Sequence, residues 1–473
     1  MIYLDKRANK PLYEQLYEDL REDIIQGTLK KNTALSSVRV MAKELQVSRN
    51  TIDRAYQQLL AEGYIRSIPG SGYYIEDISN EYFNQYNIQQ KKQTPSSANK
   101  FKERLSYDFE YSSIDSDMFP WEKWRKYMQN AILEEASYSA IPYEINKGSE
   151  ALHRSLCRYL EAKRGVKCKP EQVIICAGTQ FAIDIVTNLL SNKEYQVAYE
   201  EPGYDAMRKI FLQKGYNLTT ISVLEDGIDI DALEASPCNL LYVTPSHQFP
   251  TGVVTSITKR NKILRWADQK DAYIIENDYD SEFRYGTMPI PALQSLDTGD
   301  RVIYMGTLAK VLSPSVRCAY LILPESLLDN YEERYKFYNS ALPTYNQSAL
   351  AQFIDDGLLE KHIRKLVLAN ERKYNILDSS IREFTDDKVR IFKQPSGVHT
   401  LMQIRGCINQ EEMIKQMRQE SIGIYGTKPY WYDQSKADEE IFLMGFNAIK
   451  EDKIRPGCKK IGEVLSRKIS CIA

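Results

Sequence analysis

RVIYMGTLAK, residues 301–310, is the stretch that decides the fold class of this chain. Val302–Met305 is a short apolar run of the kind that forms a buried strand. A small turn follows, and it ends in Lys310. A lysine at the end of a buried strand can form a Schiff base with an aldehyde. Most lysines are solvated surface residues, so this interpretation depends on the rest of the chain.

Apolar runs of the same kind alternate with helical patterns from Tyr107 onward. They are continuous, which indicates strands covered on both faces. The sequence therefore predicts an α/β domain with a mainly parallel central sheet between layers of helices. From about Tyr345 a long charged helix pattern and then shorter strands predict a smaller α+β lobe. The predicted strands are Gln172–Cys176, Gln196–Tyr199, Asn239–Val243, Tyr273–Glu276, Val302–Met305 and Ala319–Leu323.

Polar side chains cluster where the predicted strands end. Gly178, Thr179 and Gln180 lie between the first strand and a helical pattern, and such a turn presents backbone N–H groups to an anion. Tyr204 follows the second strand in a Pro-Gly turn, and segments 244–252 and 276–283 follow the next two. Open α/β sheets bind ligands at the carboxyl ends of their strands, so we expect a ligand site at this edge.

The N-terminal region has a different pattern. Helices are predicted over Pro11–Gln26, Val38–Gln46 and Arg49–Glu62, followed by two short strands around a Pro-Gly-Ser-Gly tip. This order is typical of a winged helix-turn-helix. Residues 30–66 contain seven Lys or Arg and three Asp or Glu, a net charge of +4 in a chain with a net charge of −2. Phosphate contacts need such a local surplus.

The chain of 473 residues is long enough for two or three domains. Between Glu76 and Lys100, Asn, Gln, Lys and Ser predominate without apolar periodicity, which predicts a linker. We therefore divide the chain into residues 1–76, a winged helix-turn-helix; 77–106, the linker; 107–344, the large domain; and 345–473, the small lobe.

Composition excludes several classes of protein. No apolar run reaches the length of a membrane span, and the N-terminus lacks the apolar core of a signal peptide. The eight cysteines are scattered, which favours reduced thiols in a cytoplasmic protein. The four histidines lack the spacing of metal ligands, so we expect no metal site.

The N-terminal residues resemble the GntR-type winged helix. The similarity rests on Leu35–Arg39, Val47–Thr51, Ala55–Leu59 and Ala61–Tyr64, with Ser36 where the family usually has proline. The resemblance implies that the domain binds double-stranded operator DNA. It implies that Arg39 and Arg49 contact phosphates or bases, that Ser48, Asn50 and Thr51 lie at the groove, and that Gly72 allows a tight wing.

The remainder resembles fold-type I pyridoxal-phosphate (PLP) enzymes of the aminotransferase superfamily. It does so most specifically in residues 200–204, 244–252, 278–283 and 302–310. Joined to a GntR-type winged helix, it looks like the MocR/GabR family of transcription regulators. The family implies a head-to-tail homodimer and a small-molecule effector, which in some members is PLP itself.

The resemblance also implies roles for individual residues. Lys310 would be the Schiff-base lysine, and Tyr204 would stack on the pyridine ring. His247 would lie where aminotransferases place an asparagine near the ring hydroxyl, which Tyr279 would also contact. The residues expected around the phosphate are Gly178, Thr179, Gln180, Thr307 and Arg317.

Three positions of the aminotransferase-like part depart from the family pattern. Asn277 occupies the place of an aspartate that faces the pyridine nitrogen, and neighbouring Asp278 should point to the opposite face of its strand. A neutral residue cannot hold the nitrogen protonated, so weak or absent transamination is expected. Ala206 and Ala448 stand where GABA-responsive members carry arginines, so we expect no response to GABA. Lys428 or Arg208 could compensate.

Three functions remain open from sequence. The first is a PLP-dependent transcription regulator, favoured by the winged helix and the altered positions. The second is an active aminotransferase with an appended DNA-binding domain. It is favoured by the intact Lys310, Tyr204 and Tyr279. The third is a DNA-binding protein with a cofactor-free dimerisation scaffold, which the intact lysine and phosphate motifs argue against.

Overall fold

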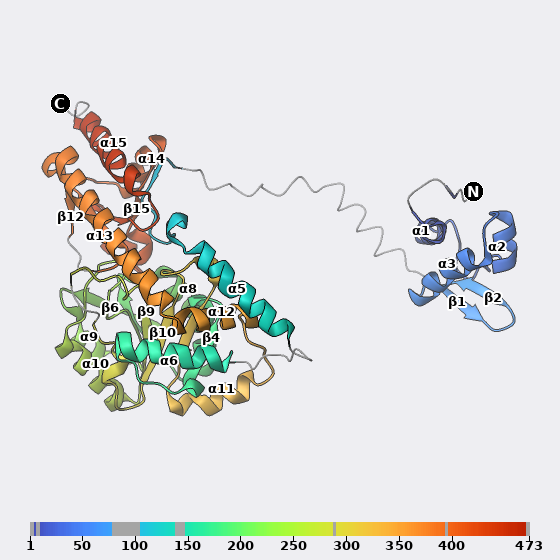
Figure 1. Cartoon of the computed structure of the whole chain (residues 1–473), viewed down its shortest axis with the longest axis horizontal. Coiled ribbons are helices and arrows are strands. Elements are labelled where there is room, and N and C mark those ends of the chain that lie inside the picture. Colours follow the sequence, from blue (N-terminus) through green and yellow to red (C-terminus); the bar gives the residue numbers. More distant parts are fainter. Residues whose placement is uncertain are drawn as a thin grey trace. The chain divides into compact units, whose positions relative to one another are not determined.

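The computed structural model describes residues 4–5, 10–77, 105–137, 147–286, 290–392 and 396–469. The chain forms two compact units, Met1–Glu103 and Arg104–Ala473 (Figure 1). Nearly all of the predicted linker, 77–106, lies outside the described residues. Each unit has its own buried core.

The N-terminal unit is a winged helix. Its helices are α1 (Leu12–Ile25), α2 (Val38–Glu44) and α3 (Arg49–Ala61), and the antiparallel strands β1 (Ile65–Ile68) and β2 (Gly72–Ile75) form the wing. Ser37 and Ser48 cap α2 and α3 by accepting backbone N–H groups. Leu16, Leu20 and Ile24 lie at helical spacing on the buried face of α1, so the three helices share one core.

The second unit is built on an eight-stranded sheet with the order β4-β11-β10-β9-β8-β5-β6-β7. The pairs β10·β9, β9·β8, β8·β5 and β5·β6 are parallel, whereas β11 and β7 run antiparallel to their neighbours. The strands are β4 (Val173–Cys176), β5 (Val197–Glu201), β6 (Leu218–Leu224), β7 (Gly227–Ile228), β8 (Leu240–Val243), β9 (Tyr273–Asp278), β10 (Val302–Thr307) and β11 (Ala319–Ile322).

Helices cover both faces of this sheet (Figure 1). Alternate strand residues belong to the cores on its two sides. One face packs on α7 (Thr179–Leu189), α8 (Asp205–Gln213) and α11 (Leu328–Tyr335). Two helix groups cover the other face: α9 (Ile230–Ala235) with α10 (Ile257–Lys270), and α6 (Glu150–Arg164) with α12 (Thr344–Asp355) and α13 (Leu358–Thr385). The predicted architecture, a mainly parallel sheet between helices, is confirmed.

The C-terminal lobe packs a second sheet against the far part of α13. The sheet has the order β12-β13-β16-β15. Its elements are β12 (Val389–Ile391), β13 (His399–Ile404), α14 (Gln410–Gln419), β15 (Tyr425–Gly426), β16 (Ile441–Gly445) and α15 (Glu451–Ile469). The core of the lobe lies between this sheet, α13 and α15.

The start of the second unit belongs to this lobe, contrary to the division at residue 345. β3 (Tyr107–Asp108) pairs in parallel with β14 (Ile422–Gly423). Phe109 is buried in the core of the lobe. The chain then enters α5 (Trp121–Ala136), which lies along α12. The chain begins in the small lobe and then crosses to the large domain. The composition does not change at that crossing, so the sequence gives no sign of it.

All six predicted strands are present, with ends shifted by at most two residues. β6 and β7 were not predicted, because β6 is mostly half-exposed and mixes Thr and Ser with its apolar residues near the margin of the sheet. None of the described helices is long and apolar enough to cross a membrane. The cysteines within the described ranges are free thiols.

Candidate cofactor pocket and DNA-binding surface

The carboxyl ends of five strands meet around a cavity of about 360 Å³. Parallel strand direction explains the convergence, because β4, β5, β8, β9 and β10 all end at the same sheet edge. The cavity is lined by Tyr111, Ser112, Ser113, Gly178, Thr179, Gln180, Tyr204, Thr244, Phe249, Asn277, Tyr279, Thr307, Ala309, Lys310, Pro314 and Arg317.

Lys310 follows β10 and reaches into this cavity. Its Nζ donates to the carbonyl oxygens of Tyr111 at 2.9 Å and Ser112 at 3.3 Å. Burial lowers the pKa of Lys310 to about 8, and the nearby carboxylates of Asp280 and Glu110 oppose that shift. An amine with this pKa is partly neutral near physiological pH and can act as a nucleophile.

One end of the cavity can hold a phosphate. Thr179 and Gln180 begin α7, where backbone N–H groups have no partner within the helix. Gly178 precedes them with φ +108°, and a Cβ there would lie 2.6 Å from Arg317 Nη2. Glycine is therefore required for the close approach of Arg317, whose Nη2 donates to Ala177 O at 2.6 Å. Thr307 lines the cavity beside them.

Asn277 and Asp278 point to opposite faces of β9. Asn277 lines the cavity, and its Nδ2 donates to the Tyr242 hydroxyl at 2.7 Å. Its Oδ1 is buried and has no hydrogen-bond partner among the described residues. Asn277, and not Asp278, therefore faces the cavity.

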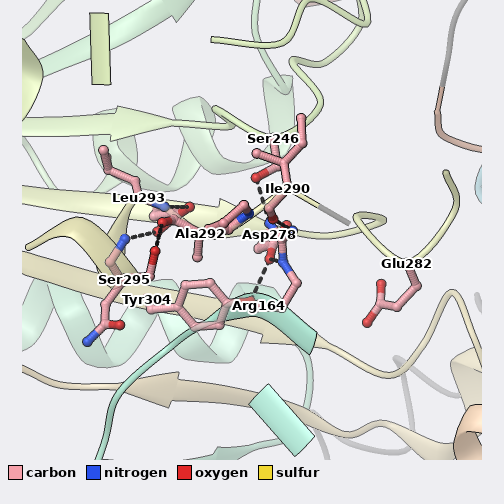
Figure 2. A network of polar contacts seen from close by, with 12 residues as sticks. Arg164, Ser246, Asp278, Glu282, Ile290, Ala292, Leu293, Ser295 and Tyr304 are labelled. Atoms are coloured by element: carbon pink, nitrogen blue, oxygen red, sulfur yellow. Dashed lines mark hydrogen bonds and ion pairs between the residues drawn. The ribbon is translucent and has the colours of Figure 1, made fainter. Parts of the chain in front are cut away.

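Asp278 is held by a buried network on the far face of the sheet, drawn in Figure 2. It accepts from Arg164 Nε at 2.8 Å and from the Tyr304 hydroxyl at 2.5 Å. Arg164 also donates to Ser246 Oγ at 2.7 Å and to the carbonyl of Ile290. With its carboxylate paired in this way, Asp278 is not available to the cavity.

Aromatic side chains form the wall of the cavity beside Lys310. Tyr204 packs edge-to-face on Phe249 at a centroid separation of 5.5 Å, and Tyr111 lies 5.0 Å from the same ring. Lys310 Nζ lies 5.0 Å from the centroid of the Tyr111 ring. Burial raises the pKa of Tyr279 well above its ordinary value, so its hydroxyl is protonated and can donate a hydrogen bond.

His247 does not line the cavity, contrary to the sequence interpretation. Its Nδ1 lies 2.9 Å from Asp280 Oδ2 and 3.1 Å from the Tyr279 hydroxyl. The segment that follows β8 folds back on itself, with Gly252 N donating to Gln248 O. That fold turns Phe249 into the cavity and places His247 behind Tyr279.

The four positions weighed for carboxylate binding offer no cation to the cavity. Ala206 and Ala448 are not among its lining residues. Arg208 donates to the carbonyls of Tyr430 at 3.0 Å, Pro429 at 2.9 Å and Trp431 at 3.3 Å. Lys428 pairs with Glu439 at 2.6 Å. Arg208 and Lys428 thus serve the structure around the cavity.

The candidate DNA-binding residues lie at the starts of α2, α3 and β2. Arg39, Arg49 and Asn50 are exposed. Ser48 Oγ accepts from Thr51 N at 3.2 Å and lies 2.9 Å from Thr51 Oγ1, so these two side chains organise the start of α3. Gly72 has φ +108° and opens β2, a conformation that glycine adopts readily.

Sequence reasoning missed three parts of the site. Phe249 lies in the segment 244–252 that had been singled out, but a loop has no periodicity from which to read its facing residue. Tyr111 contacts Lys310 from 199 residues away, and Arg164 reaches Asp278 across 114 residues. No local signal in the sequence marks either contact.

A winged helix together with a sheet whose strand ends surround a lysine and an anion site defines a DNA-binding protein with an aminotransferase-like domain. Family models agree: "Bacterial regulatory proteins, gntR family" matches residues 12–75, and "Aminotransferase class I and II" matches residues 142–435. PLP, the cofactor expected from the sequence, is the one that this aminotransferase fold uses.

Relatives share both domains over nearly the full length. The chain is 35% identical over 459 residues to the HTH-type transcriptional regulator YdeL of Bacillus subtilis, covering 97% of this chain and 98% of YdeL. It is 32% identical over 427 residues to the probable rhizopine catabolism regulatory protein MocR of Rhizobium meliloti, covering 87% and 85%. The chain belongs to the MocR-type HTH transcriptional regulators, as the sequence resemblance indicated.

The chain is also similar to a further regulator in sequence and to an aminotransferase in fold. The pyridoxine biosynthesis transcriptional regulator PdxR of Corynebacterium glutamicum is 27% identical over 454 residues, covering 96% of this chain and 95% of PdxR. Among solved structures, the α-aminoadipate aminotransferase LysN of Thermus thermophilus superposes with a TM-score of 0.68 at 21% identity, covering 83% of this chain and 100% of LysN. The second likeness concerns the fold alone.

Proposed function

We propose that this regulator holds PLP at Lys310 and that the state of this site controls its affinity for operator DNA. The observation that carries the proposal is the contrast between Lys310 and Asn277 in one cavity. The lysine keeps a lowered pKa, suited to covalent attachment. The neutral amide at 277 lacks the charge that turnover needs.

Each predicted residue has a role in this proposal. Arg317, Thr307 and the N–H groups at the start of α7 hold the phosphate, with Gly178 leaving room. Tyr204 packs on the ring, and Tyr279 donates to its hydroxyl oxygen. When bound, PLP supplies an aldehyde to which Lys310 Nζ attaches with loss of water. His247, hydrogen-bonded to Tyr279, is assigned here to positioning that tyrosine instead of contacting PLP.

The proposal includes three further elements from the family resemblance. The protein acts as a head-to-tail homodimer, Arg39, Arg49 and Asn50 contact the DNA, and Ser48 and Thr51 set the geometry of α3. The effector is PLP itself or a small amine ligand at the same site. The exposed basic residues of the N-terminal unit support the DNA assignment.

Covalent attachment is testable by mass spectrometry. Purified protein incubated with PLP and then reduced with borohydride should gain one phosphopyridoxyl group, and the peptide that contains Lys310 should carry it. Lys310→Ala should lose the label. Lys361→Ala, which changes an exposed lysine of α13, is the matched control and should keep it. A label spread over several surface lysines, or none, would refute the proposal.

An active aminotransferase is the second candidate, because Lys310 and Tyr279 are intact in the cavity. A direct assay separates the two functions. The purified protein with bound PLP should convert amino donors to keto acids at a rate close to that of free PLP. Sustained turnover of any donor well above that rate would favour the enzyme.

A further inference from the structure

The chemistry of the cavity beyond Lys310 restricts what a second ligand can be. Lys310 and Arg317 are its only cationic lining residues among those the structure describes. In the proposed function both are committed to PLP, Arg317 to the phosphate and Lys310 to the aldehyde. A ligand carboxylate in this cavity would therefore meet no cation of this chain with which to pair.

Acidic groups surround the same space. The carboxylates of Asp280 and Glu110 lie close enough to Lys310 to raise its pKa against the effect of burial. Glu110 is buried and accepts the N–H groups of Ser112 at 3.1 Å and Ser113 at 2.9 Å. Glu200 lies behind Thr244, whose hydroxyl donates to it at 2.7 Å, but burial raises the pKa of Glu200 to about 7, so it adds only part of a negative charge near neutral pH. This field attracts an ammonium group and repels a carboxylate.

The wall that faces Lys310 is apolar and firmly held. Phe249 and Tyr111 line the cavity, and Tyr430 packs edge-to-face behind Phe249 at 4.8 Å. Fully buried Leu443 of β16 completes the cluster. The three hydrogen bonds that Arg208 makes to the carbonyls of residues 429–431 fix the backing segment. Such a wall accommodates an aliphatic or aromatic body.

We infer that the site accepts a primary amine with an apolar or aromatic body and no carboxylate, in preference to an amino acid. The inference rests on the proposed function, since the ligand reacts where Lys310 holds PLP. The amine of the ligand forms a C=N bond to the aldehyde carbon while the bond to Lys310 Nζ breaks. Lys310 leaves as a free amine, and nothing is oxidised or reduced.

Matched ligand pairs test the inference on the full-length protein loaded with PLP. 2-Phenylethylamine is L-phenylalanine with a hydrogen in place of the carboxylate, and n-butylamine is 4-aminobutyrate with a methyl group in place of the carboxylate. Each is titrated while the visible absorbance of bound PLP is followed, and free PLP with the same amines corrects for their intrinsic reactivity. After correction, the amine of each pair should half-saturate at a concentration at least about tenfold below that of its carboxylate partner, by the charge-pairing energies involved.

Two variants test separately the effect of the acidic charge and the effect of the aromatic wall on ligand preference. Glu110→Gln removes the charge and keeps an acceptor for one of the two N–H groups, so it should reduce the difference in half-saturating concentration between the amine and its carboxylate partner in each pair. Phe249→Leu should weaken 2-phenylethylamine more than n-butylamine.

Equal or tighter binding of the carboxylate partners by PLP-loaded protein would overturn this inference alone and would indicate a cation supplied from a second copy of the chain. Failure of the protein to take up PLP at Lys310 would overturn the proposed function together with it.

Discussion

Lys310 is half-buried, and its Nζ has two carbonyl acceptors and an adjacent aromatic face. Because only the neutral amine is a nucleophile, the pKa of about 8 determines how the rate of PLP attachment depends on pH. Below that pH the amine is mostly protonated, so the rate of PLP attachment should rise about tenfold per unit up to pH 8 and then level off. Absorbance kinetics between pH 6 and 10 measure the rate, with Lys310→Ala as the baseline. A rate that still climbs steeply from pH 9 to 10 would indicate an ordinary surface amine.

Arg164 and Asp278 form a buried ion pair on the far side of the strand from the cavity (Figure 2). Breaking one partner of such a pair leaves an uncompensated buried charge and costs roughly 3–5 kcal/mol. Arg164→Met should therefore lower the free energy of unfolding of the second unit by that order. Arg158→Met, on the same helix, breaks an exposed pair with Asp355 and should cost less than about 1 kcal/mol. Denaturant titration measures the free energy of unfolding. Equal losses in the two variants would contradict the assignment of Arg164 and Asp278 as a buried ion pair.

Asn277 is the residue that most directly distinguishes a site that only binds PLP from a site that also catalyses transamination. Asn277→Asp places a carboxylate in the cavity, where it could keep the ring nitrogen of PLP protonated. We expect transamination of an amino donor to increase by about tenfold or more over the wild-type rate, the scale of a lost charge-assisted contact in a transition state. Single-turnover assays by absorbance provide the measurement. A variant no faster than wild type would show that another feature limits the chemistry.

At the residue scale, the direction of a side chain could be predicted where the residue lies in regular secondary structure. Strand alternation sufficed to place Asn277 and Asp278 on opposite faces, because every residue of β9 obeys the two-residue period. The sequence interpretation assigned His247 to the site and did not single out Phe249. Phe249 lines the cavity and His247 does not, since the loop after β8 folds back and has no period. Partners of Lys310 and Asp278 that lie more than a hundred residues away along the chain leave no trace in local sequence.

At the scale of elements, α3 is the helix whose start carries the candidate DNA contacts. Arg49 is exposed at its first turn. Arg49→Gln should weaken DNA binding and reduce the slope of log K against log salt by about 1, as expected for one lost phosphate contact. Lys262→Gln, which changes an exposed lysine of α10, is the control and should leave both unchanged. Fluorescence anisotropy at several salt concentrations gives both quantities, and an unchanged slope for Arg49→Gln would exclude a phosphate contact.

Strands buried on both faces were predictable because their apolar runs are continuous. β6 was not predicted because most of it is only half-buried near the sheet margin, where Thr and Ser are tolerated and interrupt the apolar run. β3 escaped for another reason: it has two residues and pairs with β14, more than three hundred residues later. Short strands formed by distant pairing depend on tertiary context, which a single sequence does not display.

At the scale of the whole molecule, the account requires the two units to be thermodynamically coupled. If PLP at Lys310 changes DNA affinity tenfold, the coupling free energy is about 1.4 kcal/mol, and DNA must change PLP affinity by the same factor. The two units have separate cores, so each can fold with its own apolar residues. The coupling is therefore a property to be measured in the intact chain.

The most direct test is the affinity of the full-length protein for the DNA upstream of its own coding sequence, measured with and without PLP. Wild type should change its Kd by about tenfold or more when PLP is added, the usual scale of allosteric coupling. Lys310→Ala should bind the same DNA with a Kd that PLP does not alter. An identical Kd with and without PLP for wild type, at PLP concentrations that label Lys310 fully, would contradict the account.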